Sequence, residues 1–341
     1  MKINIAYALD DKYSTLALVS MISALETNKN NDVEIIILYS KLKNLTLKSF
    51  ETLRKYSNCI LRFVKVDEKL FEGLPISFWV TVEAWFRVKI AELCPDLDKV
   101  LYVDCDTLII NDLSSLFVIE LKDNLFAGIL DIWDVKNHVK RLNILDKMYF
   151  NSGVLLINCS EWRKENYFEK IYDYAIKNER IIECSDQDVL NKIADGKKLK
   201  IPPQYDFMET WWRKYYNEYE NEDLINYNNA KLNPVIIHFT GLKPNYYKCL
   251  NSFKIKWWEY AKMTTAYEDL RNIYLEEEKN FKIACKKTTI LKFLYNKILW
   301  KISFSKYRKS FKIIAEDMKD VLKNYKAITK SNFKLKKSLS S

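Results

Sequence analysis

Two aspartates follow an apolar run in the segment "KVLYVDCDTLII", residues 99–110. Asp104 and Asp106 are two positions apart, so in an extended segment their side chains point the same way and can converge on one cation. Carboxylate oxygens without a companion thiolate suit Mg²⁺ or Mn²⁺, and a neutral imidazole nearby favours Mn²⁺. His238, in the apolar run "PVIIHFTG", completes a candidate metal triad. Taken alone, Asp-x-Asp is a weak motif, and a helix N-cap followed by a surface acid is then the favoured interpretation.

Apolar segments alternate with amphipathic segments along the first hundred residues. The expected strands span residues 3–9, 33–40, 58–66 and 99–103, and the expected helices span residues 10–27, 46–57 and about 81–93. Near-continuous apolar strands between helices predict an α/β fold, Rossmann-like, with a mostly parallel sheet and helices on both faces. Such sheets bind ligands at the carboxyl ends of their strands, which is where Asp104 and Asp106 fall.

The glycine and cysteine patterns exclude two kinds of site. The chain has five glycines, with neither G-x-G-x-x-G nor G-x-x-x-x-G-K-[ST], so a glycine-rich phosphate cradle is absent. A bound phosphate ester must therefore be met by a metal or by Lys and Arg. Seven cysteines without a C-x-x-C pair predict scattered reduced thiols, not a disulfide framework or a zinc site.

Six motifs carry a resemblance to glycosyltransferase family 8, the retaining sugar-nucleotide transferases, and they occur in the family's order. They are "AYALDDKY" (6–13), "AWFRVKIAELCPDLDKVLYVDCD" (84–106), "AGILD" (127–131), "YFNSGVLLIN" (149–158), "SDQDVLN" (185–191) and "HFTGLKP" (238–244). The resemblance covers residues 1 to about 262 and implies a catalytic domain with a GT-A type fold. Two positions depart from the family pattern. Lys12 replaces a frequent polar amide, and Asn245 replaces a tryptophan.

The resemblance implies a binding site for a UDP-sugar. Asp104, Asp106 and His238 would bind Mn²⁺, with Mg²⁺ as the alternative, and the ion would clamp the diphosphate of the donor. Asp10 would lie by the uracil, and Arg87 would hold the donor from the edge of the pocket. The donor-binding positions carried over from the family are Ala8, Asp10, Lys12, Tyr13, Arg87, Asp104, Cys105, Asp106, Asp131, Asn151, Asp186, Gln187, His238, Gly241 and Lys243.

The resemblance also implies the residues around the transferred sugar. Asn151 and Asp186 would hydrogen-bond the sugar, and Gln187 would face its anomeric carbon. A double displacement needs a carboxylate nucleophile near that carbon, and an amide is a poor nucleophile. We therefore favour attack by the acceptor hydroxyl on the face that UDP leaves, with the departing phosphate as base. Asp188 is the reserve candidate for a nucleophile. The backbone at Gly241 and the ammonium of Lys243 would approach the diphosphate.

Several singled-out residues have structural alternatives. Arg87 could be a helix-surface arginine, Asp131 a helix N-cap and Gly153 a bend before the strand that follows. We expect His138 at the surface and Cys105 facing the core. Four aromatic residues in segments expected to flank the acceptor cleft could stack on sugars or pack in the core, namely Phe78, Trp79, Trp211 and Trp212.

The basic charge lies in the C-terminal region. Residues 279–341 carry 18 Lys or Arg and three acids, a net charge of +15, whereas residues 1–278 carry −5. One arc of a helix drawn through this segment is apolar at Ile290, Leu291, Leu294, Ile298 and Ile302. We expect residues 263–341 to form a helical, basic, aromatic-rich region on an anionic membrane surface. A helical pair packed on the body is the alternative. No nucleic-acid-binding fold accompanies the charge, so we expect no nucleic-acid partner.

These observations predict a retaining α-glycosyltransferase that moves galactose or glucose from a UDP-sugar to a hydroxyl of a lipid-linked or lipopolysaccharide (lipooligosaccharide) acceptor. Its catalytic domain would span residues 1–262. The first residues reach Asp10 before any signal-peptide core could form, so we expect a cytoplasmic protein on the inner face of a bacterial membrane. The alternatives are a protein-directed transferase, self-glycosylating or acting on an adhesin, and a UDP-sugar-binding protein without turnover.

Overall fold

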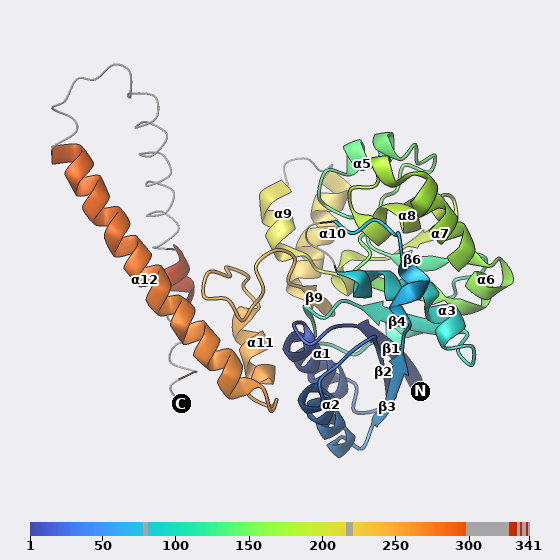
Figure 1. The fold of residues 1–341 in the computed structure, drawn as a ribbon, viewed down its shortest axis with the longest axis horizontal. Helices are drawn as coiled ribbons and strands as arrows, with labels where there is room; N and C mark the ends of the chain where they lie inside the picture. The colour runs from blue at the N-terminus through green and yellow to red at the C-terminus, as the bar shows by residue number, and fades with distance from the viewer. Residues whose placement is uncertain (78–80, 216–220, 298–326, 333–334, 336–338, 340–341) are drawn as a thin grey trace. The chain divides into compact units, whose positions relative to one another are not determined.

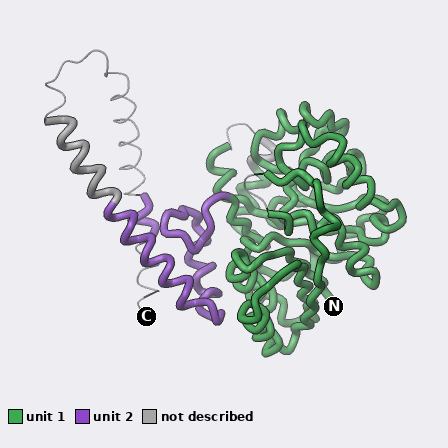
Figure 2. Tube along the Cα trace, viewed as in Figure 1, with its two compact units in different colours: residues 1–240 green, residues 241–341 purple. Residues whose placement is uncertain are grey.

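The computed structural model describes residues 1–77, 81–215, 221–297, 327–332, 335 and 339. The chain divides into two compact units, residues 1–240 and residues 241–341 (Figure 2). The first unit ends at residue 240, whereas the resemblance predicts that the catalytic domain ends at residue 262. That boundary concerns function and stays a prediction.

A seven-stranded sheet, in the order β3-β2-β1-β4-β7-β6-β8, is the frame of the first unit (Figure 1). Its strands are β1 (Lys2–Ala8), β2 (Asp32–Tyr39), β3 (Cys59–Lys65), β4 (Lys99–Val103), β6 (Phe126–Gly128), β7 (Val154–Asn158) and β8 (Lys198–Lys200). All neighbouring pairs are parallel except those of β7, which runs antiparallel to β4 and to β6. The predicted α/β fold with a mostly parallel sheet is confirmed.

A second, two-stranded sheet joins distant parts of the chain. β5 (Thr107–Ile109) and β9 (Ile236–His238) are antiparallel, and Thr107 is paired with His238. This pairing brings the histidine to the segment that holds the two aspartates.

Helices surround the main sheet. Those of the first unit are α1 (Ser14–Thr27), α2 (Asn44–Glu51), α3 (Ile90–Leu93), α4 (Ser114–Phe117), α5 (Val135–Arg141), α6 (Cys159–Lys164), α7 (Tyr167–Lys177), α8 (Ser185–Ile193), α9 (Glu209–Tyr215) and α10 (Asn221–Leu232). Its 3₁₀ helices are η1 (Thr52–Lys55), η2 (Glu68–Phe71), η3 (Val82–Lys89), η4 (Glu179–Ile181) and η5 (Pro203–Tyr205).

The segment expected as one helix over about 81–93 is a 3₁₀ helix up to Lys89 and becomes an α-helix only at Ile90. The side chain of Arg87 folds back, and its Nε donates to the carbonyl of Ala84 at 2.8 Å. It thereby competes for the acceptor that an α-helix would give to the N–H of Val88.

The central strands are apolar on both faces because both faces are covered. On one face the hydroxyl groups of Tyr7 and Ser20 of α1 are 3.1 Å apart. On the other, Ala6 and Ala8 belong to a buried cluster with Trp85 of η3. This packing explains why β1 and β2 are continuous apolar runs in the sequence.

The second unit contains α11 (Lys254–Ala261) and α12 (Tyr267–Lys297). The ammonium of Lys254, 2% exposed, donates to the carbonyls of Tyr246 and Tyr247 and to Oδ1 of Asn332 at 2.9 Å. No helix in the described ranges is long and apolar enough to cross a membrane. The predicted membrane surface falls largely on residues 298–326, which lie outside the described residues.

Candidate functional site

Asp104 and Asp106 lie in a turn between β4 and β5. The N–H of Thr107 donates to the carbonyl of Asp104 at 3.2 Å, and its hydroxyl donates to the same oxygen at 2.8 Å. The expectation of an extended segment was wrong, because this bonding closes a tight turn. The turn nevertheless brings the two carboxylates together.

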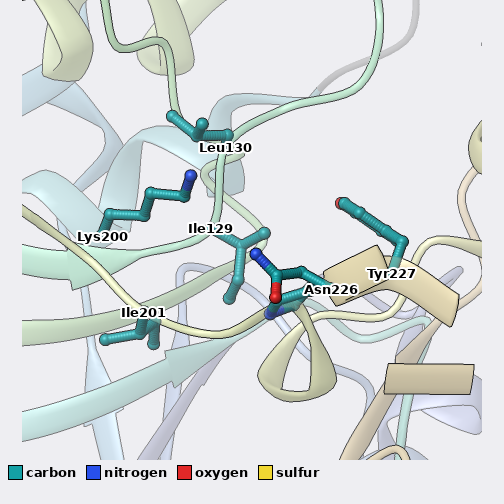
Figure 3. A pocket seen from close by; sticks show the side chains of 7 residues that line it. Ile129, Leu130, Lys200, Ile201, Asn226 and Tyr227 are labelled. Atoms are coloured by element: carbon teal, nitrogen blue, oxygen red, sulfur yellow. The ribbon is translucent and has the colours of Figure 1, made fainter. Parts of the chain in front are cut away.

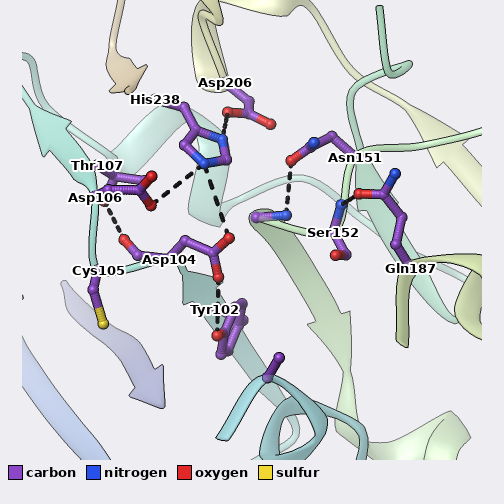
Figure 4. A network of polar contacts seen from close by, with 12 residues as sticks. Tyr102, Asp104, Cys105, Asp106, Thr107, Asn151, Ser152, Gln187, Asp206 and His238 are labelled. Atoms are coloured by element: carbon purple, nitrogen blue, oxygen red, sulfur yellow. Dashed lines mark hydrogen bonds and ion pairs between the residues drawn. The ribbon is translucent and has the colours of Figure 1, made fainter. Parts of the chain in front are cut away.

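Asp104, Asp106 and His238 meet at this turn (Figure 4). Nε2 of His238 lies 3.9 Å from Oδ2 of Asp104 and 3.5 Å from Oδ1 of Asp106. One ligand atom from each residue lies within 4.8 Å of the others. Two carboxylates and one imidazole are a donor set for Mn²⁺ or Mg²⁺, so the residues fit the ion that the resemblance implies.

Asp206 orients the imidazole of His238. Its Oδ1 lies 3.0 Å from Nδ1 of His238, and its side chain is fully buried. Burial disfavours the charged imidazole, but Asp206 and Asp106 outweigh burial and hold the pKa of His238 well above its ordinary value. In the metal-free protein the imidazolium is therefore favoured. A metal ion would displace the proton of Nε2, which faces the aspartate pair, while the proton on Nδ1 stays bonded to Asp206, as in metal sites with a carboxylate behind the histidine. Nothing in the sequence pointed to Asp206, which belongs to none of the six motifs.

Gly153 leaves space that the cluster needs. A Cβ at this position would lie 2.3 Å from Cε1 of His238 and 2.8 Å from Oδ2 of Asp104. The glycine in "FNSGV" is therefore required by close approach, in addition to any bend.

Arg87 connects the metal cluster to helix α8. Its Nη2 lies 3.0 Å from Oδ1 of Asp104, and its Nε lies 3.2 Å from Oδ2 of Asp186. The guanidinium is buried over the ring of Tyr102, so the alternative of a helix-surface arginine is wrong. Burial raises the pKa of Asp186 to about 6, although Arg87 opposes the shift.

A second polar cluster lies beside the first. Oε1 of Gln187 accepts from the N–H of Ser152 at 2.9 Å (Figure 4), and its Nε2 donates to Oδ2 of Asp131 at 2.7 Å. The amide of Asn151 donates to the same oxygen of Asp131 at 3.2 Å. Asp131 therefore accepts hydrogen bonds from two side-chain amides. It is not the N-cap of α5, because that helix begins only at Val135.

The end of β1 lies next to the aspartate turn. The parallel pairing of Ala6 with Tyr102 brings the chain at Ala8 to this position, where its carbonyl accepts from Sγ of Cys105 at 3.4 Å. Burial raises the pKa of Cys105 well above its usual value, so its thiol stays neutral and faces the core as predicted. Asp10 follows, and its Oδ1 accepts from the N–H of Tyr13.

The structure does not place the other residues that were predicted to bind the sugar donor at this site. Lys12 is exposed and lies over the ring of Tyr13. Gly241 and Lys243 belong to the second unit, and their approach to a diphosphate stays a prediction. Asp188 is fully buried, and its carboxylate bonds to Arg141 and to Tyr149.

Aromatic side chains form a stack beyond Asp131. The N–H of Trp133 donates to Oδ1 of Asp131, and its ring stacks on that of Trp211 at 6.2 Å. Trp211 stacks in turn on Tyr215. Trp212 instead is buried against Tyr227, with centroids 4.4 Å apart, so the neighbouring tryptophans have different environments. Phe78 and Trp79 are outside the described residues.

His138 was wrongly expected at the surface. It is 1% exposed, and its ring stacks on Tyr149 at 4.6 Å. His138, Cys184 and Asp188 have atoms close enough for a metal. However, Nδ1 of His138 faces Arg141 at 2.6 Å, and a guanidinium and a bound cation would repel one another. This group is a structural network.

A small pocket lies between β6, β8 and α10 (Figure 3). It is lined by Ile129, Leu130, Lys200, Ile201, Pro203, Asn226 and Tyr227 and leaves about 20 Å³ of free space. That is room for one water molecule and not for a sugar or a nucleotide.

Known proteins resemble this chain in sequence and in fold. A lipopolysaccharide 1,2-glucosyltransferase of Escherichia coli is 28% identical over 286 residues, which cover 80% of this chain and 77% of the relative. General stress protein A of Bacillus subtilis is 27% identical, covering 70% and 85%. The crystal structure of the galactosyltransferase LgtC with donor and acceptor sugar analogs is 24% identical, with a TM-score of 0.72, and the match covers 80% of this chain and all of that one. This likeness confirms the GT-A fold. The sequence profile of glycosyl transferase family 8 matches residues 4–248, and the chain belongs to this family.

Proposed function

We propose that this glycosyltransferase is a retaining, metal-dependent enzyme that moves galactose or glucose from a UDP-sugar to a hydroxyl of a glycan. The observation that carries the proposal is the convergence of Asp104, Asp106 and His238 beside the cluster around Gln187. The first cluster would hold Mn²⁺, with Mg²⁺ as the alternative. When bound, the ion would offset the charge that develops on the departing diphosphate.

The second cluster has groups for the transferred sugar. Oδ2 of Asp186 is buried and accepts no hydrogen bond from the described residues, although Nε of Arg87 lies 3.2 Å away. A buried carboxylate oxygen that accepts no hydrogen bond is costly, and a sugar hydroxyl that donates to it would reduce that cost. Asn151 belongs to the same cluster, where its amide donates to Asp131.

The contacts of Gln187 favour direct transfer. Both ends of its amide are engaged, by the Ser152 N–H and by Asp131, so it orients groups and does not attack. The acceptor oxygen then bonds to the anomeric carbon on the face from which UDP leaves. The sugar–phosphate bond breaks, and the hydroxyl proton passes to a phosphate oxygen of UDP. Retention of configuration follows from attack and departure on one face.

The acceptor is proposed to be a lipid-linked saccharide, a lipopolysaccharide or a lipooligosaccharide. The names of the glucosyltransferase and galactosyltransferase relatives support this class. Trp133 lies two residues after Asp131, and its ring stacks on that of Trp211. The two rings offer apolar faces to a pyranose ring. The +15 charge of residues 279–341 supports a peripheral position on the inner face of the membrane.

The test is UDP release by the full-length protein with Mn²⁺ and single UDP-sugars, without acceptor. One UDP-hexose should support slow release that a chelator abolishes. The double substitution Asp104→Asn/Asp106→Asn should lower release about 100- to 1,000-fold, while Asp173→Asn, on the exposed face of α7, should not. Metal-dependent release by the double variant at the wild-type rate would contradict the metal assignment. Hexose added to the chain itself, seen by intact mass, would point to a protein acceptor.

A further inference from the structure

The carboxylate of Asp188 has five hydrogen-bond donors. Oδ1 accepts from the hydroxyl of Tyr149 at 2.6 Å and from Nη2 of Arg141 at 3.1 Å. Oδ2 accepts from Nη1 of Arg141 at 2.9 Å and from the N–H groups of Glu183 and Cys184 at 2.7 and 2.9 Å. A carboxylate offers about four lone-pair sites. No site remains free to form a bond to a sugar.

This bonding also makes the carboxylate a weaker base. Burial alone would raise the pKa of Asp188, but the hydrogen bonds of Arg141, Cys184, Tyr149 and Glu183 outweigh it and hold the pKa below its usual value. The carboxylate is therefore ionised, and its negative charge is already stabilised by these donors. A nucleophile needs the opposite, a lone pair that is free of strong donors.

The donors themselves are fixed by packing. The ring of Tyr149 stacks on His138, and Nη2 of Arg141 contacts Nδ1 of the same histidine. A guanidinium has no acceptor, so Nδ1 accepts and the ring proton lies on Nε2. His138 and Arg141 come from α5, and Tyr149 precedes β7, so three segments meet at Asp188.

This network holds the start of helix α8. Ser185 has φ +45, a left-handed conformation that costs a non-glycine residue about 1–2 kcal/mol. Asp188 accepts hydrogen bonds from the N–H groups of the two residues that precede Ser185. Oγ of Ser185 accepts from the N–H of Ser77. The two residues after the strained position are Asp186 and Gln187. Strain of this kind persists only where the surroundings fix it.

We propose that Asp188 is a positioning residue, which fixes the strained start of α8 and so places Asp186 and Gln187 against the transferred sugar. No bond forms between Asp188 and the sugar at any stage. This inference rests on the proposed transferase function and assigns a role within it. The sequence left Asp188 open as a reserve candidate for the nucleophile. In this proposal no residue of the protein is the nucleophile, because the acceptor oxygen itself attacks the anomeric carbon.

The test compares Tyr149→Phe, Asp188→Asn and the double variant. Tyr149→Phe removes one donor from Asp188. Tyr172→Phe is the matched control, since its hydroxyl on α7 donates to the carbonyl of Glu72. We expect about a tenfold fall in kcat for Tyr149→Phe and about 100-fold for Asp188→Asn, with the control unchanged. The double variant should equal Asp188→Asn, because both changes disable one network. A merely structural role would lower the fraction folded and leave the kcat per folded molecule intact.

A nucleophile gives a different pattern. Tyr149→Phe would then free a lone pair and keep or raise kcat, while Asp188→Asn would abolish it. A UDP-2-fluoro-hexose donor would also release UDP and leave the 2-fluoro-hexosyl group on the peptide containing Asp188 in the wild-type enzyme. Either result overturns the proposal, and the adduct measurement stands even if a variant does not fold.

The same variants separate this inference from the proposed function. Absence of UDP release by the wild type with every UDP-sugar would refute the function. In that case calorimetry with Mn²⁺ still tests the positioning role, since Asp186 and Gln187 would contact the sugar and not the nucleotide. The variants should bind UDP like the wild type and bind UDP-hexose about tenfold more weakly. Unchanged affinity for both ligands would overturn the inference.

Discussion

Nδ1 of His238 lies 3.0 Å from Oδ1 of Asp206, and both side chains are buried. The pair fixes the ring so that Nε2 faces Asp104 and Asp106. A carboxylate behind a histidine ligand typically contributes 10- to 100-fold to metal affinity. Asp206 thus belongs to the candidate metal site although it does not face the ion.

Asp206→Asn should therefore weaken Mn²⁺ binding 10- to 100-fold without removing it. The amide keeps the shape of the carboxylate but loses the charge that makes Nε2 a stronger ligand. Titration of Mn²⁺ followed by the intrinsic fluorescence of the protein measures the affinity, and UDP release should recover at high Mn²⁺. Asp173→Asn is the exposed control. An unchanged Mn²⁺ affinity would show that His238 is oriented by other contacts.

Gly153→Ala should abolish Mn²⁺ binding at the site. The added methyl group would overlap Cε1 of His238 and crowd Oδ2 of Asp104, so at least one ligand must move. Gly196→Ala is a useful control, because its φ of +76 makes alanine strained while no atom lies within 4 Å of the new Cβ. The control should lose about 1 kcal/mol of stability and bind Mn²⁺ normally. Normal Mn²⁺ binding by Gly153→Ala would contradict the placement of the cluster.

The sequence could identify the ligands but not the contacts that orient them. Asp104 and Asp106 end an apolar strand, and that position is readable because strand ends of parallel sheets meet at one edge. Their actual turn geometry depends on two hydrogen bonds of Thr107 to Asp104, which no periodicity reports. Asp206 reaches His238 through the parallel bridge of Phe207 with Ile237, and β9 reaches the aspartates only by pairing with β5 across more than a hundred residues.

The same reason explains the error at His138. A polar residue on a short basic helix, "VKNHVKR", resembles a solvated face. Its ring stacks on Tyr149, whose hydroxyl donates to Asp188, and both of these residues come from distant segments. Long-range partners of this kind become visible only once the fold is known.

The buried carboxylate of Asp186 should make stability depend on pH in the metal-free protein. Its pKa of about 6 exceeds the ordinary value of 3.8, so folding disfavours the ionised form. The cost is fully present above pH 6, falls as the pH drops through 6, and is gone below about pH 4. Two pKa units correspond to about 3 kcal/mol. Asp186→Asn should therefore be more stable than the wild type by about 3 kcal/mol at pH 7.5 and by roughly half of that at pH 5.

Urea unfolding in a chelating buffer measures this difference. Asp173→Asn, an exposed pair with Lys177, should give the same small change at both pH values. If the difference in the free energy of unfolding between Asp186→Asn and the wild type stays constant from pH 7.5 to pH 5, Asp186 titrates normally.

Trp133 should affect the acceptor and not the donor. Stacking on an aromatic ring contributes about 0.5–1.5 kcal/mol, so Trp133→Ala should raise the KM for a glycan acceptor up to about tenfold. UDP release without acceptor should stay at the wild-type rate. Trp212→Ala is the contrast, since Trp212 packs on Tyr227 and its loss should cost about 3–5 kcal/mol of stability. A rise in the donor KM for Trp133→Ala, with the acceptor KM unchanged, would contradict a glycan-binding role.

The C-terminal charge should determine binding to an anionic bilayer. A deletion of residues 279–341 would also remove Asn332, which bonds Lys254, so loss of vesicle binding could follow from a disturbed second unit. Charge substitutions avoid this problem. Four lysines in the basic region can be changed together to glutamine, namely Lys297, Lys301, Lys306 and Lys309. Each Lys near an anionic surface contributes about 1 kcal/mol, so the four changes should lower vesicle affinity on the order of 1,000-fold.

Sedimentation with phosphatidylserine vesicles measures this affinity at low and high salt. The matched control changes four exposed lysines of the first unit, namely Lys41, Lys48, Lys55 and Lys177. It removes the same net charge from another part of the chain and should keep the wild-type affinity. Equal losses in the two variants would show that total charge attracts the protein to the vesicle, without a dedicated surface. Unchanged binding of the C-terminal variant would refute the membrane role.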